Sequence, residues 1–314
     1  MWNKKIKKWH KRKNSVEFLL TIKKQSDRIF VVKMEVIKMI IYPKTSENLE
    51  GLEYLKRYAE KYRGIEIQLL SYEQTQQITY NVIKQLKSQI PQLEEVTIHL
   101  PIREDFNFEA LAFSKINFEK ERLKMLCEAS QEFNMKLNLL YHTRWNYISW
   151  SNSGAIDRMK ELLEVIQNTN VNILIENIYA IVERKECSVL KVAKQIDNEH
   201  LKVCLDTCHL HCVANMFKIS LNEYLNTYLN KEDCMKYIQQ IHFAGTLNND
   251  GVIDKKTHGR MHDSWESFEE DYNVLKRFGI ENKIIVTEVS EDDYSTRKDQ
   301  IEEIKMLIRK DEEK

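Results

Sequence analysis

The sequence predicts an α/β protein and, within that class, a closed (β/α)8 barrel, the TIM-barrel architecture. Short runs of β-branched and apolar residues alternate eight times with longer segments whose apolar residues recur every three or four positions. Strands that alternate with helices pair in parallel through right-handed crossovers, and eight such units in about 280 residues match this barrel in number and size. The chain has 7 Gly and 3 Pro, too few for the many turns of an all-β protein. A doubly wound open sheet is the alternative, because the sequence does not show whether the sheet closes.

The expected strands are short apolar or β-branched runs. They cover residues 36–42, 65–70, 96–100, 137–141, 171–176, 201–206, 241–244 and 283–288. Each is followed by a segment with the period of an amphipathic helix and with charged residues on its other face. The expected helices cover residues 49–62, 74–89, 118–133, 155–167, 188–196, 221–238, 265–278 and 296–309. Ser46 before the first helix and Ser264 before the seventh are typical N-capping residues.

Composition and charge limit the class of protein. The 314 residues are 42% hydrophobic and 31% charged, as in a folded chain with a large core. Lys plus Arg and Asp plus Glu each total 48, so the formal charge of zero gives no general case for a nucleic-acid or membrane partner. The six cysteines form no compact disulfide framework, and no apolar run is long enough for a signal peptide or a membrane span. We therefore expect a cytoplasmic protein without a membrane partner.

The first 35 residues differ from the rest in charge. They contain eleven Lys and Arg and three acidic residues, which leaves 37 basic and 45 acidic residues from Val36 onward. We expect residues 1–35 to be a basic N-terminal extension, either a disordered tail or sequence upstream of a true start at Met34 or Met39. Residues 36–314 should form one barrel domain, because no linker or internal repeat divides them.

Six consecutive expected strands carry a histidine or a carboxylate at the same end. These residues are His99, His142, Glu176, Asp206 with His209 three residues later, His242 and Glu288. The carboxyl ends of parallel barrel strands meet at one rim, so the side chains should lie together. Burying several such groups is costly unless bound cations compensate. Imidazole and carboxylate ligands suit Zn²⁺, Mn²⁺, Fe²⁺ or Co²⁺, and the sequence therefore predicts a metal site.

Two neighbouring segments contain further candidate ligands. The cysteines at positions 204, 208 and 212 recur every four residues, but we interpret them as small packed residues of the sixth strand and the turn after it. His211 and His262 are weaker candidates. The polar segment 245–263 follows the seventh strand and is either a flexible loop or part of the site. In the second case, Asp254 and His258 would be further ligands and Arg260 would be an anion-binding group.

The segment 203–209, Val-Cys-Leu-Asp-Thr-Cys-His, resembles the sixth-strand signature of apurinic/apyrimidinic endonuclease family 2. This family, typified by endonuclease IV, belongs to the xylose isomerase-like TIM-barrel superfamily, and the resemblance covers residues 36–308. It implies two or three Zn²⁺ ions and a hydrolase that acts on a phosphodiester such as abasic DNA. By resemblance, Glu176 would bridge two metals. His99 and His142 would complete the site of the first of these metals, and Asp206, His242 and Glu288 would complete the site of the second. A third metal would be held by His209 with Asp254 or His258.

The chain departs from that family at two points. Asp254 and His258 are four residues apart, whereas the family has an Asp and a His two residues apart, followed by a Gly-Glu-Gly-like turn. After His99 the chain continues Leu-Pro-Ile-Arg and not into a tyrosine-bearing DNA loop. The expected substrate residues, which would contact a phosphate or another anion or stack on a ring, are Arg103, Arg144, Trp145 and Arg260.

The same superfamily contains ketose 3-epimerases and other sugar or sugar-phosphate isomerases, which the chain resembles through fewer residues. That resemblance implies one Mn²⁺ or Co²⁺ ion, a small sugar or sugar phosphate as substrate, and His209 as a substrate contact. The metal would be held by Glu176, Asp206, His242 and Glu288. Glu176 and Glu288 would also act as the acid and base pair that moves a proton on a substrate carbon.

His99 and His142 favour the hydrolase, because a mononuclear epimerase does not need them as ligands. The acidic barrel and the altered loop favour the isomerase. We expect the multinuclear phosphoesterase, with Glu176, Glu288 and His209 as catalytic residues and with the oligomeric state open. A barrel that only binds or regulates a partner is a third class, disfavoured because it has no physical reason to keep a full set of buried ligands.

Overall fold

The computed structural model describes two compact units, Met1–Lys38 and Met39–Lys314. The described residues are 18–22, 30–34, 39–70, 75–101, 108, 115–143, 147–177, 188–228, 235–245, 259–277, 279, 283–290 and 293–313. In the first unit, strands β1 (Phe18–Ile22) and β2 (Phe30–Met34) pair antiparallel as a two-stranded ribbon.

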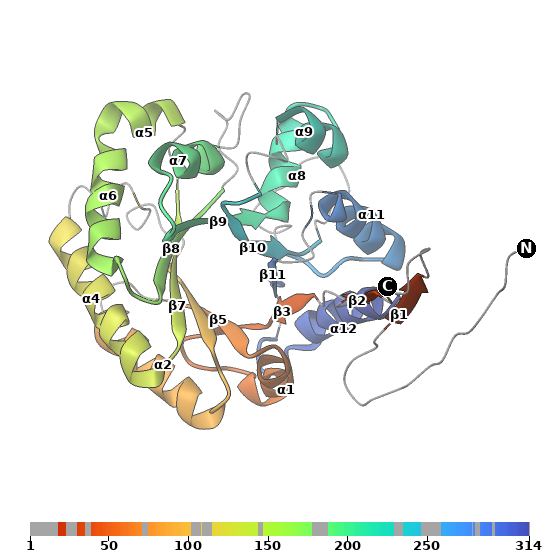
Figure 1. The fold of residues 1–314 in the computed structure, drawn as a ribbon, viewed down its shortest axis with the longest axis horizontal. Helices are drawn as coiled ribbons and strands as arrows, with labels where there is room; N and C mark the ends of the chain where they lie inside the picture. The colour runs from red at the N-terminus through yellow and green to blue at the C-terminus, as the bar shows by residue number, and fades with distance from the viewer. Residues whose placement is uncertain are drawn as a thin grey trace, which may run out of the picture. The chain divides into compact units, whose positions relative to one another are not determined.

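The second unit is built on a parallel sheet of nine described strands (Figure 1). They are β3 (Ile40–Tyr42), β4 (Lys44–Ser46), β5 (Gly64–Gln68), β6 (Glu95–His99), β7 (Lys136–His142), β8 (Val171–Glu176), β9 (Leu201–Asp206), β10 (Ile238–Phe243) and β11 (Ile284–Thr287). The two edge strands, β3 and β4, are separated in the chain by Pro43 alone. Because β3 pairs with β11 and β4 pairs with β5, the two together join the edges of the sheet.

Pro43 explains why this strand is interrupted. Proline has no backbone N–H to give to a ladder, so it is tolerated at strand ends and bulges. Its carbonyl still accepts a hydrogen bond from the backbone N–H of Glu66, at an N–O distance of 2.9 Å. Counted as one interrupted strand, β3 and β4 give the sheet eight positions, and the predicted (β/α)8 barrel is confirmed.

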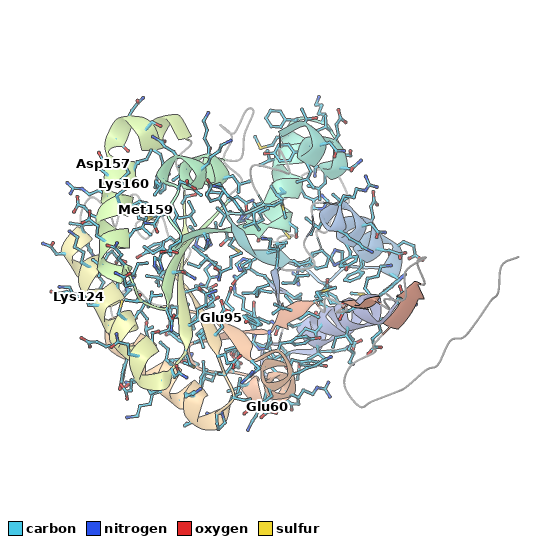
Figure 2. All side chains as sticks on the ribbon, viewed as in Figure 1. Glu60, Glu95, Lys124, Asp157, Met159 and Lys160 are labelled. Carbon is cyan, nitrogen blue, oxygen red and sulfur yellow. The ribbon has the colours of Figure 1, made fainter. Side chains whose placement is uncertain are left out.

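Helices surround the strands on the outside (Figure 1). They are α1 (Leu52–Tyr62), α2 (Thr75–Gln89), α4 (Ile116–Phe133), α5 (Tyr147–Ser153), α6 (Ala155–Ile166), α7 (Ser188–Ile196), α8 (Thr207–Met216), α9 (Leu221–Tyr228), α11 (Trp265–Lys276) and α12 (Lys298–Glu312). In α6, Met159 is buried while Asp157 and Lys160 lie on the outer side (Figure 2). This is the amphipathic pattern that the sequence predicts. Among the described residues, none of the helices has the length and apolar character to cross a membrane.

Several boundaries follow the prediction and their causes are local. Helix α7 covers the expected residues 188–196. At the start of α11, Ser264 Oγ accepts a hydrogen bond from the backbone N–H of Ser267 at 3.2 Å, so the predicted cap is confirmed. The prediction of Ser46 as a cap is wrong, because Ser46 ends β4 and α1 begins after Gly51, which has a φ of 68°.

Several elements differ from the sequence-based expectation, and helix α5 (Tyr147–Ser153) is one that was not expected. The first strand continues past residue 42, because its second half, β4, pairs with β5. The helix expected over 221–238 is too long, since β10 begins at Ile238 and pairs with β9 and β11. Helix α8 was not expected, so Cys208 and Cys212 lie on a helix and not in a turn. The side chain of Asp206 caps α8 by accepting a hydrogen bond from the backbone N–H of His209.

Alternation along the strands places polar residues at the mouth of the barrel. Leu140, Leu174 and Cys204, from three neighbouring strands, form a small apolar cluster of their own, separate from the main core. Two residues further along the same strands stand His142, Glu176 and Asp206, on the same side of the sheet. These polar side chains therefore meet above a small apolar cluster at the carboxyl ends of the strands.

Candidate metal centre

The described part of the predicted ligand set lies at the carboxyl ends of consecutive strands. It comprises His99 on β6, His142 on β7, Glu176 on β8, Asp206 on β9, His242 on β10, Glu288 just after β11, and His209 in the first turn of α8. All are buried except Glu288, whose side chain is 14% exposed. Arg260 is half-buried, and its backbone N–H donates to the carbonyl of Gly245. The other predicted site residues, Asp254, His258, Arg103, Arg144 and Trp145, lie outside the described residues.

A first group of ligand atoms comes from His99, His142 and Glu176. The two Nε2 atoms lie 3.1 Å apart, and each lies 3.3 Å from Oε2 of Glu176. The imidazole rings are stacked with their centroids 4.6 Å apart. Ligands of a tetrahedral zinc ion, at metal distances of about 2.0–2.1 Å, lie about 3.3 Å from one another. The three atoms are therefore spaced as the ligands of one cation.

A second group shares Glu176 and adds Asp206, His242 and Glu288. Oε1 of Glu176 lies 3.4 Å from Nδ1 of His242, and Oε2 of Glu288 lies 2.5 Å from the same nitrogen. The ligand atoms of the whole group lie within 4.8 Å of one another. Glu176 therefore offers one carboxylate oxygen to each of the two groups.

Several of these buried atoms have no hydrogen-bond partner among the described residues. They are Oε2 of Glu176, Nδ1 of His242, Oε2 of Glu288 and Nδ1 of His142. A buried polar atom without a partner is unusual, and a site for a bound ion is one of the recognised explanations. Two carboxylate oxygens and an imidazole nitrogen that face one another without hydrogen bonds suit a shared cation.

The protonation states of His142 and Glu176 suit metal binding. Burial lowers the pKa of His142 to about 3, although Glu176 attracts its proton, so the imidazole is neutral at neutral pH. Burial alone would raise the pKa of Glu176, but His142 and His242 hold it well below its usual range. A neutral imidazole and an ionised carboxylate are the forms that bind metals.

Two residues that the sequence analysis missed complete the cluster. Glu66 on β5 is fully buried, and its Oε1 lies 3.0 Å from Nδ1 of His99 while its Oε2 lies 3.0 Å from Nε2 of His242. Lys44 on β4 lies 2.8 Å from Oε1 of Glu66 and 2.5 Å from Oε1 of Glu288. Its Nζ also lies 2.6 Å from Nδ1 of His99. Glu66, His99 and His242 thus form a third group of possible ligand atoms, and the Lys44 ammonium lies against two of its members, Glu66 and His99.

His209 is oriented by the main chain. Its Nδ1 donates to the carbonyl of Asn177 at 2.6 Å, which leaves Nε2 without a proton in the neutral ring. Nδ1 lies 3.8 Å from Oδ1 of Asp206, and the Asp-x-x-His spacing places both residues at the first turn of α8. His209 is therefore prepared to present Nε2 as a ligand or as a substrate contact.

The cysteines behave as packed residues, in agreement with the interpretation from sequence. Burial raises the pKa of the Cys204 thiol to about 12 and that of Cys208 well above its usual value. Cys208 packs against Ala244 and Val289, and its thiol lies 3.4 Å from the carbonyl oxygen of Ala244. Protonated, packed thiols are not metal ligands.

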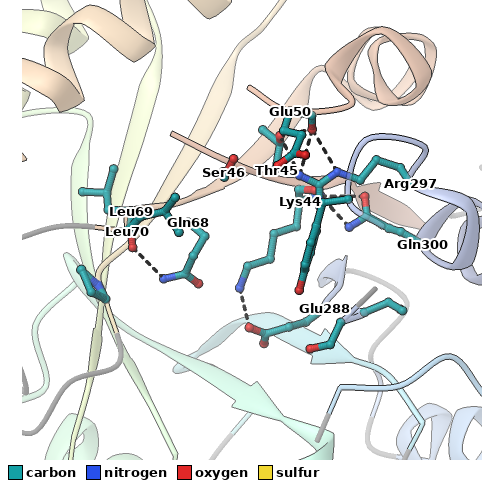
Figure 3. A pocket seen from close by; sticks show the side chains of 14 residues that line it. Lys44, Thr45, Ser46, Glu50, Gln68, Leu69, Leu70, Glu288, Arg297 and Gln300 are labelled. Atoms are coloured by element: carbon teal, nitrogen blue, oxygen red, sulfur yellow. Dashed lines mark hydrogen bonds and ion pairs between the residues drawn. The ribbon is translucent and has the colours of Figure 1, made fainter. Parts of the chain in front are cut away.

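A cavity of about 490 Å³ opens beside the cluster (Figure 3). It is lined by Lys44, Thr45, Ser46, Glu50, Gln68, Leu69, Leu70, Pro101, Glu288, Val289, Ser290, Tyr294, Arg297 and Gln300. Figure 3 shows the side chain of Lys44 directed towards Glu288. The side chains of Lys44 and Glu288 are 10% and 14% exposed, and both line the cavity. They therefore connect the buried cluster to this cavity.

The two weaker histidine candidates belong to a different network, between α8, α11 and α12. His211 Nε2 lies 2.9 Å from Oδ2 of Asp271, and His262 lies between Asp271 and Glu303, with Nδ1 2.6 Å from Oε1 of Glu303. Burial alone would lower the pKa of His262, but Asp271 and Glu303 raise it to about 9. The histidine is therefore charged and serves to tie these helices together.

Comparison with known proteins agrees with this architecture. The family model described as xylose isomerase-like TIM barrel matches residues 49–310. A curated protein described as probable endonuclease 4, from Metamycoplasma arthritidis strain 158L3-1, is 26% identical over 230 residues, which cover 69% of this chain and 77% of that protein.

Solved structures share the fold at low sequence identity. A xylose isomerase domain protein from Planctomyces limnophilus has a TM-score of 0.58 at 12% identity, covering 88% of this chain and 99% of that one. The IolI protein with a bound zinc atom has a TM-score of 0.57 at 14% identity, over 86% of this chain and 97% of that one. A D-tagatose 3-epimerase-like protein has a TM-score of 0.53 at 18% identity, over 87% and 98%. With the family model matched across most of its barrel, the chain belongs to the xylose isomerase-like TIM-barrel family, AP endonuclease family 2.

Proposed function

We propose that the protein is a divalent-metal-dependent hydrolase that cleaves a phosphodiester, with two cations side by side in the mouth of the barrel. The observation that carries this proposal is the shared carboxylate of Glu176. Its Oε2 lies 3.3 Å from Nε2 of both His99 and His142, while its Oε1 lies 3.4 Å from Nδ1 of His242. A one-metal enzyme does not need the first group, whereas a two-metal centre needs both. The similarity to a protein described as probable endonuclease 4 supports the same class of reaction.

The donor atoms fit zinc or a similar ion. Imidazole nitrogens and carboxylate oxygens are its usual protein ligands, and here several of them are buried and lack hydrogen bonds within the described residues. Such an atom costs about 1–3 kcal/mol if nothing pairs with it. The proposal is two Zn²⁺ ions at the described groups. A third would be held by His209 with Asp254 or His258, as the resemblance implies.

Bound divalent cations would neutralise the charge of a phosphodiester and stabilise the leaving oxygen. The residues of the chain hold this arrangement and keep bulk water out. Glu176 is 1% exposed and keeps its two oxygens directed to different groups. Lys44 binds Oε1 of Glu288, which leaves Oε2 directed at His242. The substrate contacts proposed from the sequence are Arg103, Arg144, Trp145 and Arg260.

A sugar or sugar-phosphate isomerase or epimerase is a second candidate. The observation in its favour is the 490 Å³ cavity that reaches Glu288, since a cavity of this size suits a small polar ligand. One Mn²⁺ or Co²⁺ ion would be held by the group of Glu176, Asp206, His242 and Glu288. Glu176 and Glu288 would then be the acid and base pair, with His209 on the substrate.

Metal stoichiometry separates the two functions. We expect protein purified without chelator to carry two or three zinc-like ions per chain by plasma mass spectrometry, and to cleave abasic-site DNA or bis(p-nitrophenyl) phosphate. One manganese- or cobalt-like ion, together with interconversion of ketoses, would support the second function instead. Protein that carries no divalent ion and binds none when Zn²⁺, Mn²⁺ or Co²⁺ is added would contradict both.

A further inference from the structure

Glu66 is a buried carboxylate that touches both candidate metal groups without belonging to either. We propose that Glu66 is a positioning residue that fixes the tautomers of His99 and His242 and so prepares both metal groups at once. The inference rests on the proposed function only in that divalent cations bind at these groups. It concerns a residue on β5, a strand that contributes none of the predicted ligands.

The geometry gives each oxygen of Glu66 one histidine. Oε1 lies 3.0 Å from Nδ1 of His99, and Oε2 lies 3.0 Å from Nε2 of His242. The carboxylate, His99 and His242 are all fully shielded from solvent, with side-chain exposures of 0%. Both contacts therefore form where a hydrogen bond is strong and an unpaired group is costly.

An ionised carboxylate only accepts hydrogen bonds, so Glu66 favours an N–H on the nitrogen of each histidine that faces it, in competition with the side-chain amide of Gln240, which lies 3.1 Å from Nε2 of His242. His99 then presents a lone pair on Nε2, which lies 3.3 Å from Oε2 of Glu176. His242 presents a lone pair on Nδ1, which lies 3.4 Å from Oε1 of Glu176. A lone pair and a carboxylate oxygen cannot hydrogen-bond to each other, but both bind a cation. The orientation imposed by Glu66 thus gives each group a nitrogen lone pair and a carboxylate oxygen that can bind the same metal ion.

Two neighbours keep Glu66 ionised and in place. Lys44 Nζ lies 2.8 Å from Oε1, and the side-chain amide of Gln240 donates to Oε2 at 2.6 Å. Lys44 Nζ also lies 2.6 Å from Nδ1 of His99 and so competes with Glu66 for that nitrogen. When a cation binds Nε2 of His99, the proton of the neutral ring is on Nδ1. Nδ1 is then a donor, and its partner is the Glu66 carboxylate and not the Lys44 ammonium. Histidine ligands held by a carboxylate in this way are typical of metal sites, and loss of the carboxylate commonly weakens binding.

Glu66→Gln is the informative variant, because an amide has the shape of the carboxylate but one oxygen in place of two. One histidine keeps its acceptor, while the other faces the NH₂ group and must move its proton to the ligating nitrogen. We expect isothermal titration of the full chain with Zn²⁺, and separately with Co²⁺, to show one site weakened by about 10- to 100-fold and the other retained. The visible absorption of bound Co²⁺ should lose the component of that site.

The matched control is Glu95→Gln. Glu95 is another carboxylate of the barrel interior, bonded to Asn138 and Gln239 at the opposite end of the strands. Its variant should bind both ions as the wild type does. If Glu66→Gln folds and binds both ions with wild-type affinities and an unchanged Co²⁺ spectrum, the inference is wrong.

A second measurement needs no variant. Long-range ¹H–¹⁵N spectra of the zinc-loaded chain, labelled at its nine histidines, report which ring nitrogen carries the proton. We expect Nδ1–H for His99 and Nε2–H for His242, and the opposite tautomer at either residue would overturn the inference. Wild-type protein that binds no divalent ion would instead count against the proposed function, so the two failures are distinguishable.

Discussion

The Nε2 atoms of His99 and His142 lie 3.1 Å apart in stacked rings, and they meet at one oxygen of Glu176. Two imidazole nitrogens this close need a proton or a cation between them. Burial holds the pKa of His142 near 3, so a second proton on that ring is disfavoured at neutral pH. A proton on Nε2 of His99 would join only the two rings, whereas a metal ion suits both nitrogens and the carboxylate together.

The double substitution His99→Ala with His142→Ala should therefore remove one ion per chain. Activity on a phosphodiester should fall to background, whereas an epimerase with its single metal at the second group would be largely spared. Plasma mass spectrometry and the two activity assays measure this. His200→Ala is the control, because His200 bonds the carbonyl of Val171 and is not one of the grouped ligands. A double variant that retains every ion of the wild type would contradict the assignment of the first group.

Glu176→Gln should weaken both metal groups at once. The amide keeps the shape of the side chain but removes the negative charge that the two groups share. We expect loss of activity under either candidate function, a lower metal content, and a lower melting temperature than the metal-loaded wild type, because a bound ion stabilises the folded state. Unchanged metal content and unchanged thermal stability would mean that the site lies elsewhere.

The meeting of the candidate ligands at the strand ends could be predicted because two simple rules act together. Parallel strands end at one rim, and residues two apart face the same side, so His142 and Glu176 had to approach each other once both strands were recognised. The Asp-x-x-His spacing likewise fixes Asp206 and His209 at one helix start. What the sequence could not supply was the tautomer of each histidine, which depends on groups from other strands.

Lys44 and Glu66 were missed for different physical reasons. Lys44 lies on β4, beyond residue 42, where the first strand was expected to end. Pro43 suggests a strand end in the sequence, but in the structure a strand resumes directly after it and pairs with β5. Glu66 sits in the middle of its strand and not at the end where ligands were sought. Its signal was present: a carboxylate between Ile65 and Ile67 in an apolar strand needs a buried partner.

The network of His211, His262, Asp271 and Glu303 should make stability depend on pH. His262 has a folded-state pKa of about 9, above its unfolded value of 6.5, so its contribution is complete below pH 6.5 and is lost as pH rises through 9. Asp271 is held near a pKa of 2 by the two histidines against the opposing effect of burial, below its unfolded value of 3.8. Its contribution is complete above about pH 4 and is lost as pH falls through 2.

We therefore expect His262 to contribute about 3 kcal/mol of unfolding free energy that disappears between pH 6.5 and 9. Urea unfolding of wild type and of His262→Gln at pH 6, 7.5 and 9 measures this. The two proteins should differ most at pH 6 and converge towards pH 9. A difference that is the same at all three pH values would show that His262 packs in place without carrying a charge.

We expect that Gly64, the first residue of β5, cannot be replaced by a larger residue without loss of stability. A Cβ atom there would overlap three ring carbons of Tyr42, which is buried and bonded through its hydroxyl to Glu95 at 3.2 Å. Gly64→Ala should destabilise the protein by about 1–3 kcal/mol, because the ring has to move within a packed core. Urea unfolding should show a much smaller cost in a Tyr42→Ala background, where the ring is absent. Equal costs in the two backgrounds would rule out the ring contact as the cause.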